Sequence, residues 1–549
     1  MKYLARSLLV TILALVFMLM SIGIKPAQAQ APADRILING KVLTVDENFS
    51  IAQAIAIRGE RIAAVGTNEE IRRLSGPNTK VTDLGGKTVI PGLIDNHIHY
   101  FRTVVYWPWE APLDAVNTRK RAMELIAEKA KSSKPGDWVL TIGGWTPRQF
   151  TDSTQMFTKE ELDRLAPNNP VFLQFGFRGG VANSMALKVV GIDSPTGRIR
   201  SVGPFAGLPK VIREALPVYT EETWKEKYFR KTNEDFNRAG VTTVWTAGAI
   251  HFPNKFKEWA RNYVKENGGW SNMRVFHHIK SDARTPEQAD RMIQAIKEWP
   301  DIEKNDYFRL QGFGEIPYLP VYDLMGPRPW RGNEETLGKY REILVAVAEK
   351  RWQLDEHIML AKKFDRVLDI FGEIDKTYDI KPLRWTTHHN YEMTKGHMEK
   401  AAKLNMFAAM HMSPAMTGGA IQRFGGLDQP PLRTALESGL RWGLGTDAKI
   451  VSPYPAFFTL YFAVTGKDVA GNMRLPNETV SRKEALIAHT RSNAWMLFME
   501  DDLGSIEPGK YADVVVLDRD YMTCPEEEIR DIESVLTLVG GRVGYKANR

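Results

Sequence analysis

Two histidines one residue apart form the pattern with the clearest chemical meaning in this sequence. They end a short apolar stretch, Pro91-Gly-Leu-Ile-Asp-Asn-His97-Ile-His99. Side chains of a β-strand repeat their direction every two residues, so both imidazoles would lie on one face. Neutral imidazoles that close together favour a divalent transition metal such as zinc. An ordinary pair of surface or core histidines has the same spacing, so the pattern needs support from elsewhere in the chain.

Further metal-binding side chains follow later stretches that are typical of strands. They are His357 after residues 352–356, His388 and His389 after residues 383–387, and Asp447 after residues 443–446. In a β/α barrel the carboxyl ends of the strands converge on one face, where active sites lie. Together with His97 and His99, these residues predict a metal site with a carboxylate base.

Three other residues are weaker candidates for the substrate pocket. Trp145 could stack on a substrate and Arg148 could meet its carboxylate, although a plain structural loop explains both residues equally well. His411 follows the strand-like residues 406–410. It is either a pocket residue or a buried histidine with satisfied hydrogen bonds.

A repeated alternation of strand and helix patterns must position these side chains. The strand-like runs after His99 are residues 138–142, 241–245, 274–279, 308–311, 352–356, 383–387, 406–410 and 444–446. Helix patterns such as residues 337–347 separate many of them, which implies parallel strands. Eight such units over roughly 400 residues suit a (β/α)8 barrel of the TIM type with insertions. An open, doubly wound sheet is the alternative.

The two ends of the chain share a sequence pattern that differs from that of the middle. Short β-rich runs broken by Asn-Gly and Arg-Gly-Glu occupy residues 30–90, and similar runs return in residues 495–549. We therefore expect an α/β protein in which residues 91–494 form the barrel and both ends together form one small β-sandwich.

The first 29 residues are typical of a signal peptide. Lys2 and Arg6 precede an apolar run over residues 8–20, and Ala27-Gln-Ala29 fits a cleavage site. An uncleaved membrane anchor is the alternative, because the apolar segment just reaches spanning length. Cleavage predicts a periplasmic or secreted protein without stable membrane association.

Composition excludes several classes of protein. The chain has 549 residues, of which 43% are hydrophobic, so it is neither disordered nor fibrous. A formal net charge of +7 is small for this length, and no stripe of basic residues predicts a nucleic-acid partner. Cys524 is the only cysteine and cannot form a disulfide within the chain.

Several motifs of the chain resemble the amidohydrolase superfamily. They are residues 91–99, Gly445-Thr-Asp447, the closing stretch Gly504-Ser-Ile-Glu-Pro-Gly-Lys through Asp518, residues 183–187 and residues 240–244. Over residues 35–545 the chain is more narrowly similar to the amidohydrolase family 3 group, which includes N-substituted formamide deformylases.

This resemblance implies a role for each strand-end residue. The implied metal ligands are His97 and His99 from strand one, His357 from strand five and His389 from strand six. His389 is favoured over His388 because a Glu-His pair of the family lines up with His388-His389. Asp447 from strand eight would touch the metal and take a proton from its water.

One departure from the family concerns strand four. Relatives often carry there a lysine that is carboxylated and bridges two metals, whereas the corresponding residue here is Arg309. Arginine stays protonated and offers no amine for a carbamate. We therefore expect one divalent ion, zinc, rather than two, unless Glu315 serves as a substitute ligand.

The resemblance implies hydrolysis of a C–N bond in an amide-like or cyclic amide-like small molecule, with His389 or His411 as a donor to the oxyanion. Ester or lactone hydrolysis, or deamination, could use the same residues. An inactive metal-binding protein that captures a small ligand is a third possibility. The chain could also form a homo-oligomer.

Overall fold

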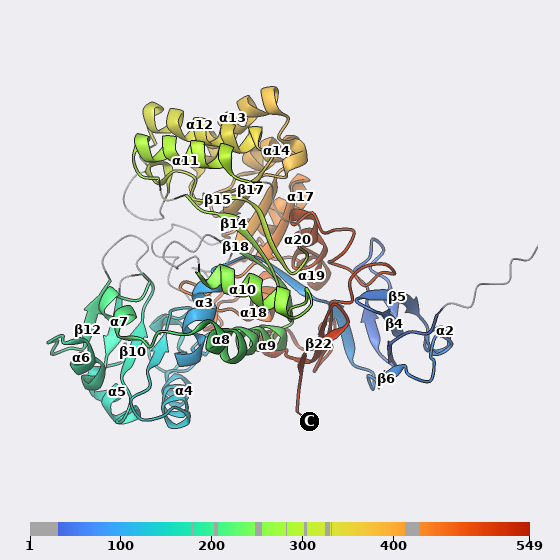
Figure 1. The fold of residues 1–549 in the computed structure, drawn as a ribbon, viewed down its shortest axis with the longest axis horizontal. Helices are drawn as coiled ribbons and strands as arrows, with labels where there is room; N and C mark the ends of the chain where they lie inside the picture. Colours follow the sequence, from blue (N-terminus) through green and yellow to red (C-terminus); the bar gives the residue numbers. More distant parts are fainter. Residues whose placement is uncertain are drawn as a thin grey trace, which may run out of the picture.

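The computed structural model describes residues 31–177, 179–201, 207–247, 255–281, 283–300, 305–323, 330, 332–411 and 428–548 (Figure 1). The predicted signal peptide lies outside the described residues. No helix of the described part is long and apolar enough to cross a membrane.

An eight-stranded parallel sheet forms the centre of the molecule (Figure 1). Its strands, in spatial order, are β8 (Leu93–Ile98), β13 (Val241–Thr246), β14 (Arg274–Ile279), β15 (Phe308–Glu315), β16 (Gln353–Ile358), β17 (Thr386–His389), β18 (Phe407–His411) and β19 (Arg441–Gly445). The end of β19 returns to β8, where the Asp447 N–H donates to the His97 carbonyl (2.8 Å) and the His99 N–H donates to the Ala448 carbonyl (2.7 Å). The sheet is therefore a nearly closed barrel, and the open-sheet alternative is excluded.

Helices cover the outside of the barrel. They include α3 (Tyr100–Tyr106), α10 (Lys255–Glu266), α11 (Pro286–Glu298), α12 (Glu334–Glu349), α13 (Ala361–Tyr378), α14 (Lys395–Lys403), α17 (Leu432–Ser438) and α18 (Ala456–Thr465). In α13 the buried residues Phe364, Val367, Leu368 and Phe371 repeat at helical spacing, which gives one apolar stripe facing the strands.

The β-sandwich contains strands from both chain ends. Its six-stranded sheet has the order β22 (Arg542–Lys546), β21 (Ser534–Val539), β20 (Val514–Leu517), β7 (Thr88–Pro91), β2 (Lys41–Leu43) and β3 (Ile51–Ala52). Its four-stranded sheet has the order β5 (Arg61–Gly66), β4 (Ala54–Arg58), β1 (Arg35–Ile38) and β6 (Lys80–Asp83). Buried side chains of both sheets share one core. The predicted barrel with a sandwich built from both ends is thus confirmed.

A separate unit, residues 110–215, interrupts the barrel after α3; we call it the insert. Its sheet has the order β12 (Arg198–Arg200), β11 (Gly179–Ala182), β10 (Val171–Gln174) and β9 (Val139–Thr141). Helices α4 (Arg119–Ser132), α5 (Lys159–Leu165), α6 (Ser184–Val190) and α7 (Lys210–Ala215) accompany it, and the insert and sandwich lie on opposite sides of the barrel (Figure 1). Assigning residues 138–142 to the barrel was wrong, because β9 pairs with β10 in the sheet of the insert.

Candidate metal centre

Three of the predicted residues meet where β8 and β19 end. His97 lies on β8, and His99 comes directly before α3 as the N-cap residue of that helix. The Asp447 Oδ1 atom lies 3.5 Å from His97 Nε2 and 3.4 Å from His99 Nε2. All three side chains are buried, so the carboxylate faces two imidazoles away from bulk water.

Glu315 connects this group to a second one. The last residue of β15 is Glu315, and its Oε1 atom lies 3.7 Å from His97 Nε2. The same atom lies 3.4 Å from His357 Nδ1 on β16 and 3.6 Å from His389 Nε2 on β17. Glu315 therefore stands between the histidines of β8 and those of β16 and β17.

These distances fit ligands that share a cation. They exceed an ordinary hydrogen bond, whereas two ligands at about 2.0–2.2 Å from zinc lie roughly 3.3–3.6 Å apart at a tetrahedral angle. Both ring nitrogens of His97 and the Nε2 atom of His389 are buried without a hydrogen-bond partner among the described residues. Orphaned buried nitrogens beside carboxylates are the donor set of a transition-metal site.

A hydrogen bond fixes the tautomer of His357. Its Nε2 atom lies 3.0 Å from the Asp323 carbonyl, which can only accept, so Nε2 carries the proton. Nδ1 is then unprotonated and faces Glu315. Burial, together with the nearby His389, lowers the pKa of His357 to about 4, so the ring is neutral at physiological pH.

The carboxylates of the site remain ionised. Burial alone would raise the pKa of Glu315, but the adjacent imidazoles of His357, His389 and His97 hold it well below its ordinary value. Burial of Asp447 is likewise outweighed by the adjacent imidazoles of His97 and His99, so its pKa is also well below the usual range. Two anionic carboxylates at the bottom of a buried site favour a divalent cation.

His388 and His389 point to different partners. His388 Nε2 contacts the buried Asp355 carboxylate, which also lies 3.0 Å from His278 Nδ1 and accepts a hydrogen bond from the Trp245 indole (3.0 Å). Asp355 was missed by the sequence analysis. Its position two residues before His357, and hence on the same strand face, was the available signal.

His411 lies inside the cluster. Its Nδ1 atom is 3.1 Å from His389 Nδ1, and its Nε2 atom is 3.2 Å from the Asn96 side-chain oxygen. The Asn96 amide nitrogen donates to Asn493 (2.8 Å), so the Asn96 oxygen accepts the His411 proton. Both ring nitrogens of His411 thus have partners within the protein. The ring has no free N–H for the substrate contact that the sequence predicted.

Trp145 and Arg148 lie elsewhere. Trp145 is buried in the core of the insert, and its indole N–H donates to Thr141 (3.0 Å), whereas Arg148 is exposed. Their predicted contacts with substrate stay predictions. Arg309 is also outside the cluster, because its guanidinium donates to Gln311 (3.1 Å) and to the Leu497 carbonyl (3.0 Å).

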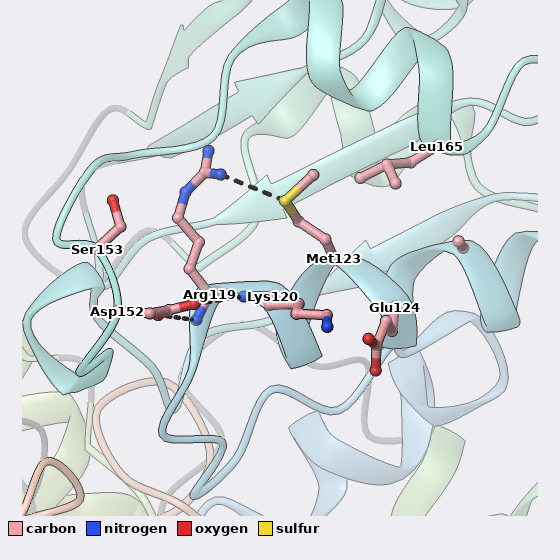
Figure 2. Close-up of a pocket in the computed structure, with 8 residues that line it drawn as sticks. Arg119, Lys120, Met123, Glu124, Asp152, Ser153 and Leu165 are labelled. Atoms are coloured by element: carbon pink, nitrogen blue, oxygen red, sulfur yellow. Dashed lines mark hydrogen bonds between the residues drawn. The ribbon is translucent and has the colours of Figure 1, made fainter.

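A hollow of about 460 Å³ lies on the surface of the insert (Figure 2). Its most prominent side chain is Arg119, which is already paired with Glu161 (2.6 Å). All of its lining residues belong to the insert, so this hollow is separate from the histidine cluster.

Comparisons with known proteins agree with this geometry. A sequence profile described as the amidohydrolase family matches residues 80–545. The N-substituted formamide deformylase of Arthrobacter pascens is 28% identical over 544 residues, which cover 93% of this chain and 98% of that protein. An uncharacterized metal-dependent hydrolase from Pyrococcus furiosus has a TM-score of 0.59 and 21% identity, covering 89% of this chain and 100% of its own. Zinc-complexed atrazine chlorohydrolase TrzN from Arthrobacter aurescens TC1 has a TM-score of 0.54 and 18% identity, covering 94% and 96%. The chain therefore belongs to the amidohydrolase family and is a metal-dependent hydrolase.

Proposed function

We propose that this hydrolase cleaves a C–N bond in a small amide-like or cyclic amide-like molecule. The observation that carries the proposal is the ionised Asp447 carboxylate facing His97 and His99 at 3.4–3.5 Å. Such a carboxylate can hold a cation and move a proton at the same point. The activity named for the Arthrobacter pascens relative, deformylation of N-substituted formamides, supports a C–N bond as the target.

Two metal positions that share Glu315 are the second part of the proposal. His97, His99 and Asp447 would hold one ion, His357 and His389 would hold the other, and Glu315 would contribute to both. The sequence predicted a single ion unless Glu315 serves as a ligand. We propose the Glu315 alternative, and its support is that Oε1 lies 3.4–3.7 Å from nitrogens of His97, His357 and His389. A bound divalent ion such as zinc would supply Lewis acidity and a water acidic enough to ionise near neutral pH.

The residues of the chain would divide the remaining work. Asp447 accepts the proton of the attacking water at its carboxylate and returns it to the leaving nitrogen. His389 was also expected as a donor to the oxyanion, but its Nδ1 atom faces His411 at 3.1 Å. We therefore propose a ligand role for His389. His411 and Asn96 would fix the orientation of its ring.

A substrate panel tests which bond is cleaved. We expect the metal-loaded protein to turn over N-formyl amines or N-acyl amino acids faster than lactones of similar size, measured by release of amine or acid. Turnover of lactones alone, or release of ammonia from an aminopurine, would replace amide hydrolysis by one of the alternative reactions. A fully metal-loaded protein without turnover on any of these compounds would indicate a binding protein.

We further propose that the enzyme works outside the cytoplasm. The support is the basic, then apolar, then small-residue pattern of residues 1–29. N-terminal sequencing of protein purified from the cell envelope or medium should give Gln30 as the first residue. An intact Met1 on membrane-bound protein would contradict cleavage and indicate an anchor.

A further inference from the structure

A buried arginine stands next to the proposed metal centre. Arg102 lies on α3, three residues after His99, and only 4% of its surface is exposed. Because His99 is the N-cap residue of α3, Arg102 lies in the first turn of the helix that starts beside the site. Its charge acts on His99 and also interacts with Glu315 and Asp447. Arg102 therefore belongs to the electrostatic surroundings of the site.

Arg102 lacks the partners that other buried cations of this protein have. The buried cationic residues of the described part are Arg102, Lys225, Arg274, Lys363 and Lys449. Each of the other four contacts a carboxylate at 2.6–2.9 Å. Arg102 forms no hydrogen bond or ion pair with any described residue, and its Nη1 atom is buried without a partner.

An unpaired guanidinium in such a place is costly. Removing a charge from water without a counter-ion is strongly unfavourable, and arginine cannot avoid the cost by losing its proton. Glu315 and Asp447, the carboxylates whose charges act on Arg102, lie beyond ion-pair distance from it and face histidines instead. A ligand that brings its own carboxylate would satisfy the fork of donors on Arg102.

We infer that Arg102 binds a carboxylate group of the substrate. The substrate class is then a small amide that also carries a carboxylate, such as an N-acyl amino acid. This inference rests on the proposed amide hydrolysis, because the carboxylate that Arg102 would bind belongs to the same substrate as the amide bond that is cleaved. Arg102 takes the role that the sequence analysis considered for the exposed Arg148.

A matched pair of compounds tests the inference. N-formylglycine and N-formylglycinamide differ only in whether the far end is a carboxylate or a neutral amide. We expect the wild-type kcat/KM to favour N-formylglycine by at least about 10-fold, the range of a charge-assisted hydrogen bond. In Arg102→Met the ratio of the two kcat/KM values should fall to near one. The kcat/KM for N-formylglycine should fall, whereas that for N-formylglycinamide should stay the same.

Further variants separate recognition from general effects. Arg102→Lys should keep part of the preference, because the charge remains without the fork. Arg213→Met removes an exposed arginine whose charge, like that of Arg102, reaches Tyr106, and it should leave the ratio unchanged. The melting temperature of Arg102→Met should equal or exceed that of the wild type, since an unpaired buried charge is removed.

Binding measurements keep this inference separate from the proposed function. Calorimetry on the Asp447→Asn protein should show tighter binding of N-formylglycine than of N-formylglycinamide, and adding Arg102→Met should abolish the difference. A binding preference without wild-type turnover of either compound would retain the role of Arg102 and remove the proposed reaction for this acyl group. Equal binding of both compounds, or a preference lost in Arg148→Met but kept in Arg102→Met, would overturn the inference.

Discussion

Replacing Asp447 with asparagine should lower kcat by at least about 100-fold while metal content stays close to that of the wild type. The amide keeps the shape of the carboxylate and still offers an oxygen toward His97 and His99. It cannot accept a proton at neutral pH. We therefore expect kcat to fall while the metal content is retained, because holding a cation needs only an oxygen lone pair whereas catalysis also needs a basic group.

A control with another buried carboxylate makes this result specific. Asp513 lies beside the sandwich core and accepts two hydrogen bonds from Arg274, at 2.9 and 3.1 Å. It is not one of the residues of the proposed metal centre. Asp513→Asn should lower the melting temperature, since it weakens a buried ion pair, and leave kcat per folded molecule unchanged. Full activity of metal-loaded Asp447→Asn would remove Asp447 as the base.

The barrel and most of the histidine cluster could be predicted because their signals are local. In residues 91–99 the strand is apolar up to its carboxyl end and then polar. This local pattern by itself predicts that the strand is buried and that its polar end faces the site. The convergence of His97, His357 and His389 then follows from barrel geometry alone. Here the chain's local preferences agree with its final fold.

Other features depend on contacts between distant segments. Residues 138–142 have the apolar character of a barrel strand, but β9 pairs with β10 of the insert. The pattern of a buried strand does not say which sheet buries it. Arg102 presents a similar problem, because an arginine in the first turn of a helix resembles a surface residue. Only the folded arrangement reveals that it is buried and that no described carboxylate pairs with it.

Glu315 falls between these two cases. The sequence predicted a strand over residues 308–311, whereas β15 extends to Glu315 and places this residue in register with Glu356 of β16. Two glycines, Gly312 and Gly314, obscure the strand pattern. A Cβ atom at either position would come within 2.3 Å of the backbone oxygens of β16, so the close approach of the strands requires glycine.

Glu315→Gln should lower the metal content of the purified protein from about two ions per chain to about one. Its Oε1 atom lies 3.4–3.7 Å from nitrogens of His97, His357 and His389, so it is the group common to both proposed positions. Glutamine keeps one oxygen but loses the negative charge that a shared ligand between two divalent ions supplies. The position formed by His357 and His389 has no other carboxylate among these ligands and should empty first. When this position empties, we expect kcat/KM to fall by at least about 100-fold. Kinetic assays and metal analysis by mass spectrometry on the same samples would measure both effects.

Glu356→Gln is the matched control, because Glu356 is equally buried and in register with Glu315. Its carboxylate pairs with Lys363 (2.6 Å) and accepts a hydrogen bond from Tyr340 (2.8 Å), on the helices outside the barrel. This variant should keep its full metal content, whatever it does to stability. Equal metal content in wild type and Glu315→Gln at about one ion per chain would support the single ion expected from the absence of the lysine. In that case Glu315 would be an anionic neighbour of His357 and His389 and not a ligand common to two ions, and the shared-ligand proposal would be wrong.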